Sequence, residues 1–281
     1  MNFLPQDLKK QLILSLSTQY SLSEANTITH QVFEHIIGTN HTLFYESSLT
    51  DEQFKQYEHI KTRLAKGEPL QYVLERAYFF DLTLYVNKHV LIPRPETEEM
   101  VEWLIKHIQN TPNSIKKILD IGTGSGCIPI TLKKKLPHLH IYAWEISPDA
   151  LEVATCNAEQ HKTEVHFSQQ DLFQSSIEEA FTEFDCIISN PPYIPWTEKS
   201  QLDKNVVNYE PHIALFVPDS NPLLFYEAIA IRAKNACKPV ITEVHQNYAD
   251  RVEKLYLDAG LNNPKTFKDI SQNKRWVTAN F

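Results

Sequence analysis

The chain has 281 residues, a formal net charge of −8 and 42% hydrophobic residues. Its 14 Phe, 12 Tyr and 4 Trp make too much apolar surface for an unfolded chain, so disorder is excluded as its main state. The acidic balance argues against a general nucleic-acid binder, which needs cationic side chains to neutralise phosphates. It favours a small molecule or a protein as the substrate, and we expect no direct nucleic-acid binding.

The 4 cysteines are far apart and form no Cys-x-x-Cys pair, so neither a disulfide framework nor a zinc site is expected. No stretch approaches the roughly 18 uninterrupted apolar residues of a membrane-spanning helix. We therefore expect a cytoplasmic protein that binds no metal and no membrane.

Residues 1–71 are expected to form a small helical bundle. Ser21 is followed three residues later by Glu24, and Thr50 by Gln53, and each pair has the spacing of a capping box at the start of a helix. Apolar residues then recur at helical spacing, which predicts about four helices in this first domain.

Residues 72–95 change to the pattern of strands and are expected to link two domains. The segments 78–80 and 82–86 are aromatic and β-branched, and Asn87-Lys88 lies between two short runs. This pattern predicts a β-hairpin that turns at Asn87-Lys88.

Two prolines, Pro93 and Pro95, end this linker. Because proline fixes the backbone and restricts the residue before it, we expect an extended turn here and no helix. Glu96 or Thr97 is then expected to open a helix that covers 99–108.

From residue 96 to 281, short apolar runs alternate with helical patterns. The alternation predicts an α/β domain with a mostly parallel, doubly wound sheet, and the last two runs, 265–269 and 275–279, are expected to pair as an antiparallel hairpin. Ligands of such sheets bind at the carboxyl ends of the strands. The chemistry-bearing residues at those ends are Asp120 to Gly126, Glu145, Asp171 and Asn190.

A glycine-rich turn follows the first of these strands. Gly122, Gly124 and Gly126 allow a ligand to approach the backbone closely, but their spacing differs from the Gly-x-Gly-x-x-Gly of dinucleotide-binding proteins. Asp120 precedes the turn, and its carboxylate suits an ammonium group better than a phosphate. Glu145 ends the next strand, where an acid binds ribose hydroxyls. Together they favour S-adenosylmethionine (SAM) over a dinucleotide.

A second motif, Asn190-Pro191-Pro192-Tyr193, comes directly after a buried run. Prolines lack N–H donors and stiffen the backbone, which leaves the Asn190 side-chain oxygen and the Pro191 carbonyl as two acceptors for a planar NH₂ group. Tyr193 is suited to lie face-on against a flat amide or base. In isolation the tetrapeptide is a proline-stiffened loop with a buried Tyr; beside a SAM loop it indicates an amino-group methyltransferase.

Six segments in a fixed order carry a more specific resemblance. They are Gly67-x-Pro69-Leu70-Gln71-Tyr72, Leu91 to Glu98, Asp120 to Cys127, Ser147 to Leu151, Asn190 to Ile194 and Tyr209-Glu210-Pro211. Together they resemble the peptide chain release factor N5-glutamine methyltransferases. The resemblance implies methyl transfer from SAM to the glutamine of the Gly-Gly-Gln motif in class I release factors, with S-adenosylhomocysteine as the second product. It also implies a Rossmann-like SAM domain over 96–281, a hairpin linker over 72–95 and a helical docking domain over 1–71.

The family's contacts map onto this sequence residue by residue. Cofactor contacts are implied for Asp120, Gly122, Thr123, Gly124, Ser125, Gly126, Glu145, Asp171, Leu172 and Asn190. Substrate contacts are implied for Asn190, Pro191, Pro192 and Tyr193, of which Asn190, Pro191 and Tyr193 are the expected catalytic residues. Four places depart from the family pattern. The ribose-binding acid is more often Asp than Glu145, and some members have an aromatic residue at Leu172. The segments Phe216 to Ser220 and Lys238-Pro239 lack glycines that the family usually has there.

The expected mechanism follows from the weak nucleophilicity of an amide nitrogen. Asn190 and the Pro191 carbonyl are expected to accept both N–H bonds and so orient the nitrogen lone pair and stabilise its developing positive charge. No strong base is required, because a methylated amide cation loses its proton readily. Arg94 and Glu96 are expected to order the loop beside SAM through a structural ion pair in preference to contacting the substrate.

Three alternatives stay open on the sequence. A nucleic-acid adenine or guanine amino-methyltransferase would use the same tetrapeptide on a flipped base, although it would want a basic groove. A non-catalytic SAM-binding module would not need an intact Asn190 and Tyr193. A dinucleotide oxidoreductase is disfavoured by the glycine spacing. For the release-factor enzyme we expect a monomer whose helical domain docks the protein substrate, since a Gly-Gly-Gln loop alone offers little surface for specificity.

Overall fold

The computed structural model describes residues 4–38, 48–111, 114–174 and 179–281. Contacts divide the chain into two compact units. One holds the residues up to Arg76 together with Asp203–Tyr209, and the other holds Ala77–Leu202 and Glu210–Phe281. The grouping of 203–209 with the helical unit differs from the contiguous division expected from the sequence, and the boundaries at 71/72 and 95/96 stay a prediction.

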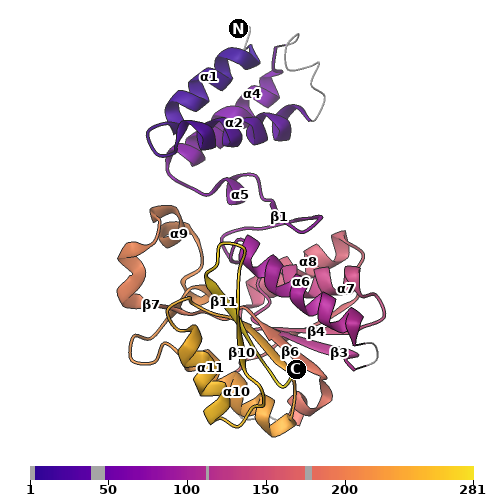
Figure 1. The fold of residues 1–281 in the computed structure, drawn as a ribbon. Coiled ribbons are helices and arrows are strands. Elements are labelled where there is room, and N and C mark those ends of the chain that lie inside the picture. Colours follow the sequence, from indigo (N-terminus) through magenta and orange to yellow (C-terminus); the bar gives the residue numbers. More distant parts are fainter. Residues whose placement is uncertain (1–3, 39–47, 112–113, 175–178) are drawn as a thin grey trace. The chain divides into compact units, whose positions relative to one another are not determined.

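The first unit is helical, as expected (Figure 1). Its helices are α1 (Pro5–Leu16), α2 (Leu22–Ile37), α4 (Asp51–Ala65), α5 (Leu70–Val73) and α9 (Lys204–Tyr209). Both predicted capping boxes are formed, Ser21 with Glu24 at the start of α2 and Thr50 with Gln53 at the start of α4. The apolar faces of α1, α2 and α4 meet in one core around Phe33. The Tyr57 hydroxyl inside this core donates to the Leu8 carbonyl at 2.9 Å, so its polar group is satisfied.

A short hairpin, β1 (Ala77–Phe79) and β2 (Leu82–Leu84), opens the second unit. Its turn lies at Phe80-Asp81, so the prediction of a turn at Asn87-Lys88 is wrong. Phe80 adopts the left-handed conformation with φ of 50°, which an aromatic residue takes only under tertiary constraint. Its ring packs against one of the hydrophobic cores of this unit, and Lys135 Nζ lies 5.9 Å from the ring centroid. These contacts between distant segments are not visible in a sequence pattern.

The second unit is built on a seven-stranded sheet with the order β10-β11-β9-β6-β3-β4-β5. The strands are β3 (Lys117–Ile121), β4 (His140–Glu145), β5 (Val165–Gln169), β6 (Cys186–Ser189), β9 (Val240–Glu243), β10 (Lys265–Lys268) and β11 (Lys274–Ala279). The five strands from β9 to β5 are parallel, and β10 and β11 form an antiparallel hairpin at one edge. The predicted fold class, a mostly parallel sheet with a C-terminal hairpin, is confirmed.

Helices cover both faces of this sheet (Figure 1). They are α6 (Pro95–Asn110), α7 (Cys127–Lys135) and α8 (Pro148–Gln160) against one face, and α10 (Leu224–Ala236) and α11 (Ala249–Asp258) against the other. Neighbouring residues of β3 separate the two cores, because the side chain of Ile118 belongs to the first core and that of Leu119 to the second.

Helix α6 begins earlier than the sequence indicated. Pro95 is its first residue, and Arg94 is the cap. Proline is tolerated at the first helical position because the N–H that it lacks has no helical partner there. As a result, Thr97 lies inside the helix with only 2% of its surface exposed.

Short elements complete the second unit between β6 and α10. They are β7 (Ile194–Pro195), β8 (Phe216–Val217) and the 3₁₀ turns at Trp196–Gln201 and His212–Ala214, while a further turn at Glu179–Glu183 precedes β6. Strands β7 and β8 pair in parallel and anchor the segment that follows Asn190. No helix in the described part of the chain is long and apolar enough to cross a membrane.

Candidate active site

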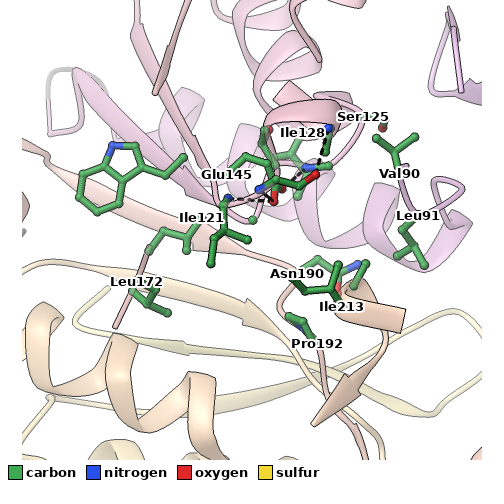
Figure 2. A pocket seen from close by; sticks show the side chains of 18 of the residues that line it. Val90, Leu91, Ile121, Ser125, Ile128, Glu145, Leu172, Asn190, Pro192 and Ile213 are labelled. Carbon is green, nitrogen blue, oxygen red and sulfur yellow. Dashed lines mark hydrogen bonds between the residues drawn. The ribbon is translucent and has the colours of Figure 1, made fainter. Parts of the chain in front are cut away.

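A cavity of about 330 Å³ opens at the carboxyl ends of β3, β4 and β6. Its size lies within the range of small-molecule sites. Figure 2 shows that Glu145, Leu172 and Asn190 approach it from different segments of the chain. Of the residues predicted from the sequence, those that line the cavity are Gly122, Thr123, Gly124, Ser125, Glu145, Asp171, Leu172, Asn190 and Pro192. The remaining four, Asp120, Gly126, Pro191 and Tyr193, lie next to lining residues in the chain but are not among them.

Glu145 holds the glycine loop in place. Its Oε2 accepts a hydrogen bond from the Gly124 N–H at 2.9 Å, and its Oε1 accepts from the N–H groups of Ile146 and Ser147 at 2.9 and 3.1 Å. A carboxylate has about four acceptor sites, so three backbone bonds leave capacity for a ligand hydroxyl. The expected ribose-binding acid therefore also fixes the shape of the loop around it.

Both the backbone conformation and the packing at the last glycine of the loop, Gly126, favour a residue without a side chain. Gly126 has a φ of +79°, and a Cβ at this position would lie 3.0 Å from Ile130 Cδ1 and 3.2 Å from Ala154 Cβ. The absence of a side chain thus lets α7 pack closely against α8 directly behind the loop. Gly126 accordingly acts on the packing behind the loop and not on the surface of the cavity.

Asp120 is fully buried in the centre of the sheet, and neither of its carboxylate oxygens has a hydrogen bond of ordinary geometry within the described residues. Burial raises the pKa of this carboxyl group to about 7. The nearby Thr123 hydroxyl, which can donate a weak hydrogen bond to it, opposes this rise, and the charge of Glu145 adds to it. A buried carboxylate without partners is costly, whereas a cationic ligand nearby would stabilise it.

The loop also carries two buried hydroxyl groups that face a ligand site. Thr123 and Ser125 line the cavity, are 4% and 2% exposed, and have no hydrogen bond of ordinary geometry from their hydroxyl oxygens within the described part of the chain. Buried hydroxyls are ordinarily paired. Two of them beside a cavity therefore fit a ligand that carries both donors and acceptors.

Asn157 of α8 ties the loop to the segment after the hairpin. Its Nδ2 donates to the carbonyls of Tyr85 and Ser125, both at 2.9 Å, and its Oδ1 accepts from the Tyr85 N–H at 2.6 Å. The side chain is fully buried. Its three hydrogen bonds fix one wall of the cavity.

Asn190 follows β6, and its side chain is held by a buried relay. The Asn190 Nδ2 donates to Thr97 Oγ1 at 3.1 Å, and the Thr97 hydroxyl donates to Glu243 Oε2 at 2.6 Å. The Tyr193 hydroxyl donates to the other carboxylate oxygen of Glu243 at 3.2 Å. Glu243 is 1% exposed. Burial raises its pKa to about 7, against the opposing effects of the Thr97 hydrogen bond and the charge of Arg275.

Arg94 forms a structural ion pair, as expected, but its partner is Glu210 and not the expected Glu96. Its Nη2 lies 2.5 Å from Glu210 Oε1, and Glu210 Oε2 accepts from the Ile92 N–H at 3.2 Å. The Glu210 side chain is 1% exposed. The pair therefore joins two of the motif segments, which are more than a hundred residues apart in the chain, at the edge of the cavity.

Sequence reasoning did not find Glu243, Thr97 or Asn157 as parts of the site. Glu243 offered one signal, because an acidic residue ends the apolar run of β9, at the same sheet edge as Asp120 and Glu145. Thr97 lies within the motif segment from Leu91 to Glu98, but the resemblance implied no contact for it. Asn157 lies in an amphipathic helix, where a single Asn carries no functional signal by itself. In the described residues, no group of three or more His, Cys, Asp or Glu side chains could hold a metal ion.

Comparison with known proteins agrees with this geometry. Residues 96–209 match the family model of the methyltransferase small domain, and residues 10–74 match that of the PrmC N-terminal domain. Solved structures share the fold alone: the catalytic domain of hMettl16 bound to the MAT2A 3′UTR hairpin 6 has a TM-score of 0.57 at 16% identity and covers 82% of this chain and 81% of that chain. The N-terminal domain of human METTL16 in complex with SAH has a TM-score of 0.53 at 16% identity and covers 95% and 93%.

Curated relatives are more similar in sequence. The release factor glutamine methyltransferase of Flavobacterium psychrophilum is 38% identical over 276 residues, which cover 96% of each chain. That of Bacteroides thetaiotaomicron is 40% identical and covers 80% of this chain and 81% of the relative. That of Lactococcus lactis is 38% identical and covers 80% and 76%. This chain therefore belongs to the release factor glutamine methyltransferase family and is a SAM-dependent methyltransferase.

Proposed function

We propose that this enzyme methylates the side-chain amide nitrogen of the glutamine in the Gly-Gly-Gln motif of class I release factors. The observation that carries the proposal is the orientation of Asn190 at the cavity. Because its Nδ2 donates to Thr97, its Oδ1 is the atom left to accept a hydrogen bond from a substrate NH₂ group.

The residues around the cavity fit SAM. Glu145 has acceptor capacity for the ribose hydroxyls. Asp171 and Leu172 line the same cavity and would contact the adenine. The hydroxyls of Thr123 and Ser125 suit the polar amino-acid portion. The uncompensated carboxyl group of Asp120 fits the positive charge of this ligand.

SAM supplies an electrophilic methyl group on its sulfonium. The task of the protein is to make a poor amide nucleophile reactive by orientation. Asn190 Oδ1 and the Pro191 carbonyl accept the two N–H bonds, direct the nitrogen lone pair and stabilise the charge that develops on nitrogen. No group in this arrangement has to abstract a proton before transfer, because the methylated nitrogen is acidic enough to lose one to water.

The test is methyl transfer from labelled SAM to purified release factor, DNA or RNA. We expect label in the release factor, mapped by mass spectrometry to the glutamine of Gly-Gly-Gln, and none when that glutamine is replaced by alanine. Label in the amino groups of DNA or RNA, and none in the release factor, would favour the adenine or guanine methyltransferase instead.

We also propose that the helical unit contacts the release factor, and that the enzyme acts as a cytoplasmic monomer. Leu14 and Leu22, in the helical unit, are 72% and 66% exposed and offer apolar contact. Replacing both by serine is expected to raise KM for the intact release factor and to leave KM for a short Gly-Gly-Gln peptide unchanged. Leu257→Ser is the matched control, because Leu257 is 59% exposed in the other unit. Equal KM values for wild type and the double variant would contradict the docking role.

A further inference from the structure

Three segments far apart in the sequence meet behind Asn190. Thr97 comes from the first turn of α6, Glu243 from the last residue of β9, and Asn190 from the loop after β6. Thr97 and Glu243 are 2% and 1% exposed, so water does not compete for their hydrogen bonds. The relay runs in one direction, from Asn190 through Thr97 to Glu243.

The direction of the relay decides which end of the Asn190 amide faces the substrate. A threonine hydroxyl has one proton, and here it is donated to Glu243 at 2.6 Å. Thr97 Oγ1 can then only accept, so it binds the NH₂ end of Asn190 and leaves Oδ1 for the substrate. In the reverse orientation, the Asn190 NH₂ would face the NH₂ of the glutamine, donor against donor, and could not bind it.

The same carboxylate also supports the far end of the tetrapeptide. The Tyr193 hydroxyl donates to Glu243 Oε1 at 3.2 Å, and the Tyr226 hydroxyl donates to the main-chain carbonyl of Glu243 at 3.1 Å. Both side-chain oxygens of Glu243 thus receive a hydrogen bond, and Glu243 is not among the residues that line the cavity. It has no route to the reacting nitrogen and acts through its neighbours.

We propose that Glu243 is a positioning residue that, through the Thr97 hydroxyl, fixes the Asn190 side-chain amide with its oxygen toward the substrate. This inference rests on the proposed methylation of a glutamine amide and adds a residue to it. Thr97 lies between the two residues, and its single hydroxyl proton sets the direction of both hydrogen bonds.

The relay requires Glu243 in its ionised form, which only accepts hydrogen bonds. Burial raises the pKa of Glu243 to about 7. The charged or titratable groups that interact with it are Arg275, Glu96, Tyr193, Tyr226 and Cys127. A protonated Glu243 can itself donate to Thr97, which frees the Thr97 proton to turn toward Asn190 and removes the preference for one amide orientation. The kcat is therefore expected to rise with pH as Glu243 ionises.

The test compares variants of the full-length enzyme by kcat at saturating SAM and release factor. Thr97→Val and Glu243→Leu each remove the relay and are expected to lower kcat about 10- to 100-fold with little change in SAM affinity. The double variant is expected to be no slower than the slower single variant, because both remove the same interaction. Thr131→Val is the control, since Thr131 is also a buried helical threonine but lies outside the site.

Two conservative variants separate positioning from general support of the fold. Thr97→Ser retains the hydroxyl and is expected to recover most of the kcat lost in Thr97→Val. Glu243→Gln can still accept from Thr97 but cannot titrate, so it is expected to retain part of kcat and to lose the rise of kcat near pH 7. Saturating SAM keeps Asp120 ionised over this range, so Asp120 does not contribute to that rise.

The results of these experiments test the role of Glu243 and the proposed function independently of each other. An unchanged kcat in Thr97→Val, or a rise near pH 7 that persists in Glu243→Gln, overturns the role of Glu243 while the wild-type enzyme still methylates glutamine. Absence of release-factor methylation by wild type overturns the proposed function itself. Should Glu243→Leu fail to fold, Thr97→Val and Glu243→Gln decide the question.

Discussion

Two fully buried carboxyl groups lie at the same sheet edge, and they differ in what surrounds them. Burial raises the pKa of both Asp120 and Glu243 to about 7. Asp120 has no hydrogen bond of ordinary geometry in the described chain, whereas Glu243 accepts from Thr97 and Tyr193. A buried charge with only a weak hydrogen bond is stabilised by a ligand of opposite charge nearby, whereas a charge with strong hydrogen bonds fixes the groups that donate them. We therefore expect Asp120 to act on the charge of SAM and Glu243 to hold the groups around Asn190 in place.

The largest expected effect is the loss of kcat when Asn190 is replaced, since we propose that Asn190 acts on the reaction whereas Asp120 acts on SAM binding. Asn190→Ala removes an acceptor that acts on the developing charge, and it is expected to lower kcat by about 1,000-fold or more while weakening SAM binding only modestly. Stopped assays with labelled SAM and calorimetric titration of SAM measure the two quantities. Methyl transfer near the wild-type rate would refute the assignment of Asn190.

Asp120→Asn should give the opposite pattern. It removes the uncompensated charge near the expected cationic ligand and is expected to raise the Kd for SAM about 10- to 100-fold, with a much smaller effect on kcat at saturation. Unchanged SAM affinity would show that the charge of Asp120 does not act on the ligand, and the contrast between the two carboxyl groups would then fail.

The pH dependence of SAM binding tests whether the ionisation of Asp120 is linked to the ligand, as the comparison with Glu243 implies. The pKa of Asp120 is about 7 without ligand, so below pH 7 Asp120 is protonated in most molecules. These molecules must release that proton when they bind the cationic ligand. The Kd for SAM is expected to fall up to about 10-fold per unit as pH rises from 6 toward 7, and to level off above 7. Calorimetry in two buffers of different ionisation enthalpy detects the released proton. A pH-independent Kd, or the same slope in Asp120→Asn, would contradict this account.

The smallest effect concerns the stability of the ligand-free protein. The raised pKa of Asp120 means that the folded state binds more protons than the unfolded state between pH 3.8 and about 7, so its ionisation destabilises the fold increasingly as pH rises through this window. Asp120→Asn lacks this penalty and is expected to be more stable by roughly 1 to 3 kcal/mol at pH 8. The advantage should shrink toward pH 4 in thermal unfolding curves, and a variant less stable than wild type at pH 8 would contradict the expectation.

The sequence predicted those parts of the site that lie within one short segment. The glycine loop, Glu145 and the tetrapeptide from Asn190 each combine residue types and spacing that point to chemistry without tertiary information. The relay could not be predicted in this way, because Thr97 and Glu243 are 146 residues apart. Thr97 lies in a motif segment, but nothing within that segment shows that its hydroxyl contacts Glu243.

Two errors in the predicted elements have the same origin. The hairpin turns at Phe80-Asp81, where Phe80 is left-handed against its local preference and packs against the core and Lys135. Helix α6 begins at Pro95, and the sequence pattern treated this proline as a barrier to a helix when it is an acceptable first residue. The second error concealed that Thr97 faces the interior beside Asn190.

The most direct measurement is a crystal structure of the enzyme with S-adenosylhomocysteine and a release factor that carries Gly-Gly-Gln. We expect the glutamine amide nitrogen to donate one hydrogen bond to Asn190 Oδ1 and one to the Pro191 carbonyl, with Thr97 still bridging Asn190 and Glu243. A glutamine held by other groups, or an Asn190 turned away from it, would contradict the central claim.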